Sequence, residues 1–473
     1  MGSQPVSREE LKAYWDAIAP DRARFRARAR YFHRRQERMF RSLIPEGSSV
    51  LELGCGTGEL LAAVRPARGV GIDFSEKMIG IAQAKHPDLE FRVMDAEELA
   101  LDEKFDVVIL DDLVNHLSDV QKCFEGLRRV SHARTRILIT FYSAVWQPAV
   151  KLAEWLRLKL PARQPNWLTF GDIDGLLALA DCEAVRWQRN VLFPYWLPLL
   201  SEFLNRFVVK LPLLRHLAMQ GLVVARVKEG VDRDAATSVV IPCRNERGSI
   251  EDAVRRTPVM GRATELIFVD GASTDGTPEE IERVMREHPE REITLLRQGD
   301  ALGKGDAVRK GFEAARYPVL MILDADLTVP PEGLPRFRDA LVAGKGEFIN
   351  GSRLVYPMEK QAMRFLNLLA NRIFGLLFTW LLEQRVRDTL CGTKALLRAD
   401  YQRIARGRAY FGDFDPFGDF DLLFGAAKLN LKIVEIPVRY RERTYGVTNI
   451  SRFRHGWLLL GMCWKAFRRL KLV

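Results

Sequence analysis

Acidic residues at the ends of short apolar runs give the second half of the chain its clearest chemistry. The strand-like runs are SVVIP (238–242), ELIFVD (265–270) and VLMILDAD (319–326), and Asp324 and Asp326 lie where the last of them ends. A strand that terminates there leaves both carboxylates able to reach one hard cation, which in turn holds a diphosphate. Because α/β sheets bind ligands at the carboxyl ends of their strands, these residues predict a diphosphate and metal site at one sheet edge.

A glycine-rich turn carries the corresponding signal in the first half. A strand-like run with Glu52 leads into Gly54, Gly56 and Gly58, after which a helix begins. Glycines permit a tight turn and let a ligand approach the backbone N–H groups at a helix N-terminus. Asp73, nineteen residues after Gly54, ends the next strand, where its carboxylate can accept from two ribose hydroxyls. The pattern predicts a nucleoside-containing cofactor; a Rossmann site for NAD is the alternative, although such sites prefer G-x-G-x-x-G.

The turn and the acid that follows it resemble class I S-adenosylmethionine methyltransferases, whose hallmark is E/D-x-G-x-G-x-G after the first strand. The resemblance covers residues 35–140 and implies a Rossmann-like fold with S-adenosylmethionine as cofactor. The residues that it implies for cofactor binding are Glu52, Gly54, Gly56, Gly58, Asp73, Asp95, Ala96 and Asp111. Asp112 and His116 follow in a loop that faces the cofactor or the substrate, and for His116 a catalytic base and a structural imidazole both stay open. The methyl acceptor would be a small molecule, a sugar or a glycolipid of the same pathway.

Four further motifs accompany the two strand-end aspartates. They are ALGKGDAVRKGFEAA (301–315), NGSR (350–353), DTLCGTK (388–394) and RTYGVTN (443–449). Together with the D-x-D they resemble family 2 glycosyltransferases with the GT-A fold, in particular those of the dolichol- or polyprenol-phosphate mannosyltransferase type. The resemblance covers residues 236–456. The last motif departs from the usual R-x-Y-G-E-S-K at Val447, Thr448 and Asn449, which leaves acceptor or diphosphate recognition by that loop open.

This resemblance implies the transfer of one sugar from a UDP- or GDP-sugar to a polyprenyl phosphate. The residues implied for nucleotide-sugar binding are Pro242, Asn245, Glu246, Asp270, Asp275, Lys304 and Asp324. Asp324 and Asp326 would hold Mg²⁺ or Mn²⁺, and the residues given catalytic roles are Asp324, Asp326, Arg353, Arg443 and Asp419. A lipid phosphate needs no strong base because its oxygen is already ionised. For a hydroxyl acceptor on a cell-envelope polymer or glycolipid, the base could come from Asp413, Asp415, Asp419 or Asp421, and a solvated acidic loop is the alternative.

Two sheets are needed to position these residues. Short β-branched runs alternate with longer helical patterns twice over, which is typical of doubly wound α/β domains with parallel strands. The polar stretch 229–236 has no such pattern and indicates a linker. We therefore expect a Rossmann-like methyltransferase domain over 1–228 and a GT-A domain over 237–473, although a length of 473 residues alone suggests about three domains.

Two stretches of the second domain suggest a membrane surface. In 359–385 polar residues recur at helical spacing and form a narrow stripe on an apolar helix. Residues 436–473 carry nine Lys or Arg and one Glu among tryptophans and leucines, which favours anionic lipid over packing on the same domain. The apolar run 193–214 suggests an apolar cavity, an interdomain contact or plain core, and plain core is the expectation. No apolar run reaches the roughly 18–20 residues of a membrane span and no signal peptide is recognisable, so we expect a cytoplasmic protein, peripheral on the cytoplasmic face of the membrane.

The net charge and the cysteine content limit which other functions and which redox environment fit the sequence. The formal charge of +11 invites anionic partners. Nine arginines between residues 22 and 41 make a nucleic-acid contact conceivable, but a solvated helix face beside the cofactor entrance is the favoured interpretation. An RNA methyltransferase is therefore the rival function. No RNA-binding module is recognisable and the charge excess lies largely near the apolar C-terminus, so no nucleic-acid partner is expected. The six cysteines show no C-x-x-C pair and no zinc-type spacing, which favours a reducing cytosol.

Overall fold

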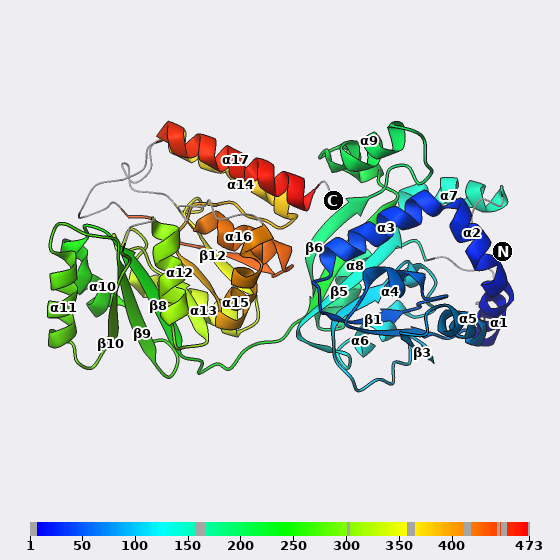
Figure 1. Cartoon of the computed structure of the whole chain (residues 1–473), viewed down its shortest axis with the longest axis horizontal. Helices are drawn as coiled ribbons and strands as arrows, with labels where there is room; N and C mark the ends of the chain where they lie inside the picture. The colour runs from blue at the N-terminus through cyan, green and yellow to red at the C-terminus, as the bar shows by residue number, and fades with distance from the viewer. Residues whose placement is uncertain are drawn as a thin grey trace. The chain divides into compact units, whose positions relative to one another are not determined.

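The computed structural model describes residues 7–156, 166–299, 303–356, 365–410, 418–441, 445 and 452–471. The chain divides into two compact units, Met1–Lys228 (unit 1) and Glu229–Leu470 (unit 2), and each unit is built on its own sheet (Figure 1). The division falls at the start of the polar stretch 229–236.

Unit 1 is built on a seven-stranded sheet with the order β3-β2-β1-β4-β5-β7-β6. Its strands are β1 (Ser49–Leu53), β2 (Arg68–Asp73), β3 (Glu90–Val93), β4 (Phe105–Leu110), β5 (Ser131–Tyr142), β6 (Cys182–Asn190) and β7 (Gln220–Val227). The α/β fold class is confirmed, but the sheet is mixed, because β7 runs antiparallel to both β5 and β6. The central strands β1 and β4 are mostly apolar and buried, as expected for strands covered on both faces.

Helices cover both faces of this sheet (Figure 1). They are α1 (Arg8–Ile18), α2 (Arg22–Arg28), α3 (Arg30–Leu43), α4 (Glu59–Val64), α5 (Glu76–Lys85), α6 (Val120–Gly126), α7 (Gln147–Trp155), α8 (Phe170–Leu179) and α9 (Leu200–Arg206). The arginine-rich stretch forms α2 and α3. In α3, Phe32, Gln36 and Phe40 recur every four residues and are buried, so this helix packs through one stripe while most of its arginines lie off that stripe.

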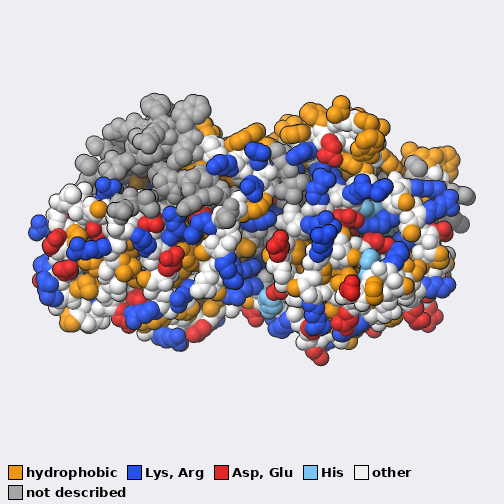
Figure 2. Space-filling view, in the orientation of Figure 1, with side chains coloured by type: hydrophobic (Ala, Val, Ile, Leu, Met, Phe, Trp, Pro, Cys, Tyr) orange, Lys and Arg blue, Asp and Glu red, His pale blue; other side chains and the backbone are white. Residues whose placement is uncertain are grey.

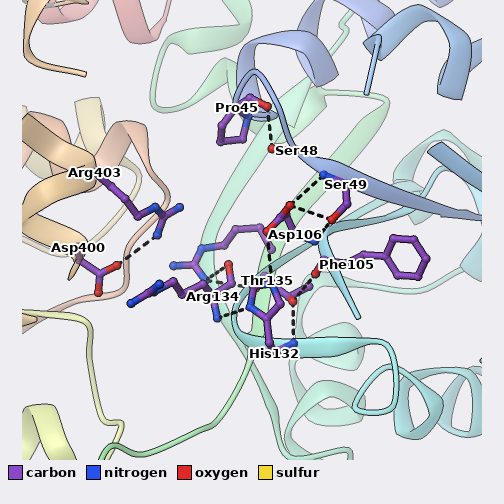
Figure 3. Close-up of polar contacts among 11 residues, drawn as sticks. Pro45, Ser48, Ser49, Phe105, Asp106, His132, Arg134, Thr135, Asp400 and Arg403 are labelled. Carbon is purple, nitrogen blue, oxygen red and sulfur yellow. Dashed lines mark hydrogen bonds and ion pairs between the residues drawn. The ribbon is translucent and has the colours of Figure 1, made fainter. Parts of the chain in front are cut away.

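The amino ends of β1, β4 and β5 are joined by a polar cluster (Figure 3). Asp106 accepts hydrogen bonds from the backbone N–H and the hydroxyl of Ser49 at 2.9 and 2.8 Å, and its other oxygen lies 3.3 Å from Nε2 of His132. The Thr135 hydroxyl donates to the Phe105 carbonyl at 2.6 Å. The Ser49 hydroxyl is directed at Asp106 and not at His132, and the cluster lies at the strand ends opposite the glycine turn. We therefore assign it to strand register and not to catalysis.

Unit 2 is built on a second seven-stranded sheet, with the order β10-β9-β8-β11-β13-β12-β14. Its strands are β8 (Thr237–Cys243), β9 (Thr264–Asp270), β10 (Glu292–Arg297), β11 (Val319–Ile322), β12 (Phe348–Ser352), β13 (Lys394–Leu397) and β14 (Ile433–Pro437). β13 runs antiparallel to β11 and β12, so this sheet is also mixed. β11 ends at Ile322, and the strand therefore terminates before Asp324 and Asp326.

The helices of unit 2 include the two stretches expected to face lipid. They are α10 (Ile250–Arg256), α11 (Thr277–Glu287), α12 (Lys304–Ala314), α13 (Leu334–Val342), α14 (Phe365–Leu382), α15 (Arg398–Arg406), α16 (Asp419–Lys428) and α17 (Arg452–Leu470). α14 and α17 pack against each other, with the rings of Trp380 and Phe467 stacked at 5.6 Å (Figure 1). One face of α17 is buried through Met462 and Ala466, whereas Trp464 is 61% exposed. Among the described helices, none combines the length and the apolar character needed to span a bilayer.

The apolar run 193–214 is not core, and this prediction was wrong. Much of it is exposed, with Leu199 at 89% and Leu213 at 86% exposure. The reason is that α9, at the centre of the run, packs inward through two polar side chains: Ser201 and Asn205 are fully buried.

Candidate functional site

Unit 1 contains a cavity of about 420 Å³ at the carboxyl ends of β1, β2 and β4. Five of the eight residues predicted to bind the cofactor line it: Gly54, Asp73, Asp95, Ala96 and Asp111. The other three, Glu52, Gly56 and Gly58, belong to the strand end and turn that carry Gly54 and are not part of the lining. Asp112 and His116 line the same cavity. The fold thus gathers predicted residues from four separate segments of the chain.

The glycine turn is dictated by backbone conformation and by space. Gly54, Gly56 and Gly58 have φ values of 69°, 52° and 80°, in the left-handed region that side chains disfavour. A Cβ on Gly54 would lie 2.7 Å from a methyl group of Leu113, and one on Gly56 would lie 2.9 Å from Nε of Arg22. The positive φ values therefore favour glycine at these places, and α4 begins directly after the turn.

Asp73 is fixed by the turn on one side and by the start of α5 on the other. Its Oδ2 accepts from the N–H of Gly56 and its Oδ1 accepts from the N–H of Ser75, both at 2.9 Å. Burial raises the pKa of Asp73 although both hydrogen bonds oppose that shift. Each carboxylate oxygen has a second lone pair, so this side chain keeps acceptor capacity for a pair of hydroxyl groups in the cavity.

Two further carboxyl groups near the glycine turn, those of Glu52 and Asp111, interact through their charges. Burial, followed by the charge of Asp111, raises the pKa of Glu52 well above its usual range, and Glu52 Oε2 has no hydrogen-bond partner among the described residues. Burial, followed by the charge of Asp112, raises the pKa of Asp111. Asp111 Oδ1 accepts from Nε2 of Gln36 at 2.5 Å and from the hydroxyl of Thr140 at 2.6 Å. Burial and a neighbouring negative charge disfavour the ionised form of these carboxyl groups. A positively charged ligand would stabilise that form, so the site suits such a ligand.

Helix α1 closes one side of the cavity through contacts that the sequence analysis missed. Arg8 forms ion pairs with Asp95 and Glu97, the second at 2.7 Å. The ring of Trp15 meets that of His116 edge to face at 5.2 Å. Arg8 and Asp95 are 87 residues apart, so no local pattern in the sequence signals the pair.

In unit 2, the predicted diphosphate and metal residues lie at the end of β11. Nζ of Lys304, at the start of α12, lies 2.5 Å from Oδ1 of Asp324. Burial alone would raise the pKa of Asp324, but the Lys304 ammonium holds it below its usual value. Asp326 Oδ1 accepts from the Thr328 hydroxyl at 2.9 Å. A Cβ on Gly392 would collide with Oδ2 of Asp324, so the D-x-x-x-G-x-K segment needs its glycine to pass this carboxylate.

Asp419 and Asp421, at the start of α16, are buried and paired. Nζ of the fully buried Lys394 lies 2.5 Å from Oδ1 of Asp419. Nε of Arg408 donates to Asp421 at 2.9 Å. The alternative of a solvated acidic loop therefore does not hold for these two residues. Asp413 and Asp415 lie outside the described residues.

Arg353, predicted to bind phosphate, is paired with Asp388. Its Nε and backbone N–H donate to Asp388 Oδ2 at 2.7 and 2.9 Å, and its Nη2 donates to Oδ1 at 2.8 Å. The Asp388 side chain is fully buried. In this geometry Arg353 links the end of β12 to the segment before β13, and Asp388 is a site-supporting residue whose role the sequence analysis did not assign.

The predicted nucleoside residues lie at the carboxyl ends of β8 and β9 and in the loops that follow these strands. They are Pro242, Asn245, Glu246, Asp270 and Asp275. Oδ1 of Asn245 accepts a hydrogen bond from the backbone N–H of Thr274 at 2.8 Å. The backbone N–H of Asn245 donates to the Ser273 hydroxyl at 2.9 Å. Asp275 accepts from the hydroxyl of Thr277 at 2.5 Å. These bonds join the two loops into one wall. Arg443 and the departures at 447–449 lie outside the described residues.

Comparison with known proteins agrees with both resemblances. Residues 44–178 match a family model described as a methyltransferase domain, and residues 238–404 match the model of glycosyl transferase family 2.

Two relatives and one solved structure illustrate the matches. Glycosyltransferase AglD of Haloferax volcanii is 29% identical over 231 residues, 48% of this chain but only 35% of that protein. Polyprenol monophosphomannose synthase of Mycolicibacterium smegmatis is 28% identical over 221 residues, 46% of this chain and 81% of that protein. A SAM-dependent methyltransferase structure from Thermotoga maritima aligns with 46% of this chain and 98% of its own at 15% identity and a TM-score of 0.37. The chain thus contains two regions that match different transferase families, a methyltransferase domain over residues 44–178 and glycosyl transferase family 2 over residues 238–404.

Proposed function

We propose that unit 2 transfers one sugar from a UDP- or GDP-sugar to a polyprenyl phosphate, and that unit 1 methylates an acceptor of the same pathway with S-adenosylmethionine. The observation that carries the first activity is the juxtaposition of Asp324, Asp326 and Lys304 at the carboxyl end of β11. The similarity to a polyprenol monophosphomannose synthase supports the class of acceptor.

The donor set of unit 2 suits a divalent metal ion. Asp324 and Asp326 offer the carboxylate oxygens that Mg²⁺ and Mn²⁺ prefer. Among the described residues no three His, Cys, Asp or Glu side chains form a metal-binding group, so diphosphate oxygens and water would complete the coordination. When bound, the ion would offset the charge that develops on the departing nucleoside diphosphate. Lys304 adds a fixed positive charge at the same place.

The pairing of Asp419 favours a phosphate over a hydroxyl acceptor. In the proposed step a phosphate oxygen of the lipid bonds to the anomeric carbon, and the bond from that carbon to the donor diphosphate breaks. An ionised phosphate needs no base, whereas a hydroxyl does. Oδ1 of Asp419 lies 2.5 Å from the buried ammonium of Lys394, so this oxygen is already engaged by a donor and does not face a free acceptor hydroxyl. Transfer to a saccharide hydroxyl is the alternative.

The cavity of unit 1 suits S-adenosylmethionine. Asp73 keeps acceptor capacity for ribose hydroxyls, Asp95 and Ala96 line the wall proposed for adenine, and Asp111 offers a carboxyl group to a cationic ligand. The cofactor supplies a methyl group activated on a sulfonium. Asp112 and His116 line the same cavity and are the groups proposed to receive a proton from the methyl acceptor.

We further propose that unit 2 meets the cytoplasmic face of an anionic membrane through the outer face of α17. Leu460 and Trp464 are exposed there beside Lys465, Arg468 and Arg469. An amphipathic helix with this composition binds in the interfacial region of a bilayer.

The test uses the full chain, labelled UDP- and GDP-sugars, Mn²⁺ and polyprenyl phosphate. Label extracted into organic solvent with the lipid is the expected result. Label that appears only on an added soluble saccharide would contradict the lipid-phosphate acceptor and support the hydroxyl alternative.

A further inference from the structure

The segment 193–217 of unit 1 presents its large apolar side chains to solvent. The exposed ones include Trp196, Leu199, Phe203, Phe207, Leu213 and Leu217, hereafter the 193–217 surface. Figure 2 shows these orange side chains gathered over α9. Contiguous exposed apolar surface of this kind marks an interaction site more often than isolated exposed leucines do.

Two polar side chains of α9, Ser201 and Asn205, face inward, whereas the apolar Phe203 of the same helix is 57% exposed. Asn205 is fully buried; its Oδ1 accepts from the N–H groups of Leu192 and Phe193 at 2.6 and 3.0 Å, and its Nδ2 donates to the Phe193 carbonyl at 2.7 Å. Ser201, one turn earlier, is also fully buried and donates to the Tyr195 carbonyl at 2.7 Å. The buried hydrogen bonds of Asn205 and Ser201 therefore stabilise the segment, and the apolar side chains of the 193–217 surface point towards solvent. Such a helix is suited to surroundings less polar than water.

Leu199 adds a second sign that the surface serves a purpose other than folding. Its φ is 63°, in the left-handed region that a side chain disfavours, and its side chain is 89% exposed. Glycine would adopt this conformation at lower cost. A strained and exposed leucine at the start of α9 is better explained by what it contacts outside the unit.

The charges of the segment indicate an anionic partner. Its basic residues are Arg206, Lys210 and Arg215, whereas its one acid is Glu202. Glu202 lies 4.0 Å from the guanidinium of Arg35, which offsets its charge. Apolar side chains flanked by cations match a bilayer interface with anionic headgroups.

The same segment forms part of the cavity wall in unit 1. Phe193 and Tyr195 line the cavity together with Val150 of α7. Trp146, directly before α7, donates from Nε1 to the Leu217 carbonyl at 2.7 Å and so joins α7 to the far end of the segment. The exposed apolar surface is thus continuous in the chain with the lining of the proposed cofactor cavity.

We propose that the 193–217 surface inserts into the headgroup region of an anionic membrane, and that the methyl acceptor of unit 1 is carried on a lipid that reaches the cavity past Phe193 and Tyr195. This inference rests on the proposed methyltransferase function of unit 1. In the step, a heteroatom of the acceptor bonds to the methyl carbon, the carbon–sulfur bond breaks with its electrons going to sulfur, and the proton of the acceptor passes to a cavity carboxylate or to water.

The binding test compares the full chain with the Leu199→Glu/Leu213→Glu variant. Vesicles of equal parts phosphatidylglycerol and phosphatidylcholine are the probe, and flotation measures binding. Both sites are nearly fully exposed, so the fold should tolerate the change, and unaltered S-adenosylhomocysteine binding by calorimetry checks unit 1. We expect vesicle affinity to fall about tenfold or more, since two apolar anchors are lost and two negative charges face anionic lipid. Leu179→Glu, at a 66% exposed leucine of α8, is the matched control and should bind as the wild type does.

The outcomes separate this proposal from its alternatives. The comparison is repeated in a Trp464→Glu background, so that any contribution of α17 is removed. Equal vesicle binding by the variant and the wild type would overturn the proposal. So would a wild-type dimer that the double variant converts to monomer, because the surface would then bind a second copy.

The lipid acceptor is tested with methyl-labelled S-adenosylmethionine and vesicles made from a membrane lipid extract of the source cells. Label in the organic phase is expected, and label confined to water-soluble product would overturn the lipid acceptor. Failure of the wild type to bind S-adenosylhomocysteine would instead refute the proposed methyltransferase function and leave the vesicle result to be judged by itself.

Discussion

At the residue scale, buried carboxyl groups at the two candidate sites have pKa values shifted in opposite directions. In unit 2, Asp324 and Asp388 each face a cation, and the pKa of each is held below its usual value against the effect of burial. In unit 1, burial raises the pKa of Glu52 and of Asp111, and Asp111 in addition meets the charge of Asp112. Stability should therefore depend on pH with opposite sign at the two sites.

Glu52→Gln tests the buried acid of unit 1. The folded protein keeps a proton on Glu52 at a pH where the unfolded chain, with a pKa of about 4.3, has lost it. The side chain therefore costs more stability as the pH rises above that value. Glutamine stays neutral, so the Tm of the variant without ligand should be close to the wild-type Tm near pH 4 and higher than it at about pH 8.

The matched control is Glu98→Gln, at an exposed glutamate of the same unit. It should leave the Tm unchanged at both pH values. A Tm difference for Glu52→Gln that is the same at both pH values would contradict the account.

Asp388→Asn tests the buried ion pair of unit 2. Burial opposes ionisation, yet Arg353 lowers the pKa of Asp388 to about 2. The pair therefore stabilises the fold above the unfolded pKa of about 3.9, and this contribution is lost as the pH falls towards about 2. Breaking a buried pair leaves an uncompensated charge, so the variant should lose about 3–5 kcal/mol at neutral pH, measured by denaturant unfolding of the full chain.

Asp252→Asn is the control for this change, because Asp252 pairs with Arg255 at 3.0 Å on the surface. An exposed pair of this kind is worth about 0–1 kcal/mol. A loss for Asp388→Asn no larger than that of the control would refute a stabilising role for the pair.

Strand-end acids could be predicted from the sequence, but their partners could not. Asp73, Asp324 and Asp326 each follow or end an apolar run, and this local pattern can be recognised in the sequence alone. The ion pair of Arg353 with Asp388 joins residues 35 positions apart in different segments. Such pairs depend on how the sheet brings segments together, which local spacing does not determine.

At the element scale, the segment before β13 must pass directly beside Asp324. A Cβ on Gly392 would lie 2.5 Å from Nζ of Lys304 and would collide with the Asp324 carboxylate. Gly392→Ala should therefore reduce glycosyl transfer at least tenfold by displacing these two groups, since small misplacements of reacting groups are costly. Initial rates with the labelled donor measure this effect.

Gly333→Ala is the matched control, because a Cβ there meets no atom within 4 Å and its φ is not in the left-handed region. It should transfer sugar at the wild-type rate. Wild-type activity of Gly392→Ala would show that the segment is not confined as described.

Four strands are hard to predict from the sequence pattern, for two physical reasons. β3, β6 and β10 are edge strands, and each carries polar residues that interrupt the apolar pattern of a central strand. β13 has only four residues. The prediction that the run 193–214 is core was also wrong, since an apolar run does not reveal whether polar neighbours such as Asn205 face inward.

At the scale of the whole molecule, two catalytic sites are proposed in one chain, each at the carboxyl ends of its own seven-stranded sheet. No described residue that lines the cavity of unit 1 belongs to unit 2. The two units should therefore be separable in function. A mutation that inactivates one site should leave the activity of the other unchanged.

The most direct test is a reciprocal comparison of Asp326→Ala and Asp73→Asn in the full chain. Each variant is assayed for sugar transfer to polyprenyl phosphate and for S-adenosylhomocysteine binding by calorimetry. Asp326→Ala should abolish transfer and leave the Kd for S-adenosylhomocysteine unchanged. Asp73→Asn should weaken that binding about tenfold or more, through loss of a charged acceptor for the ribose, and leave transfer unchanged. Loss of both activities in either variant, or undiminished transfer by Asp326→Ala, would contradict the account.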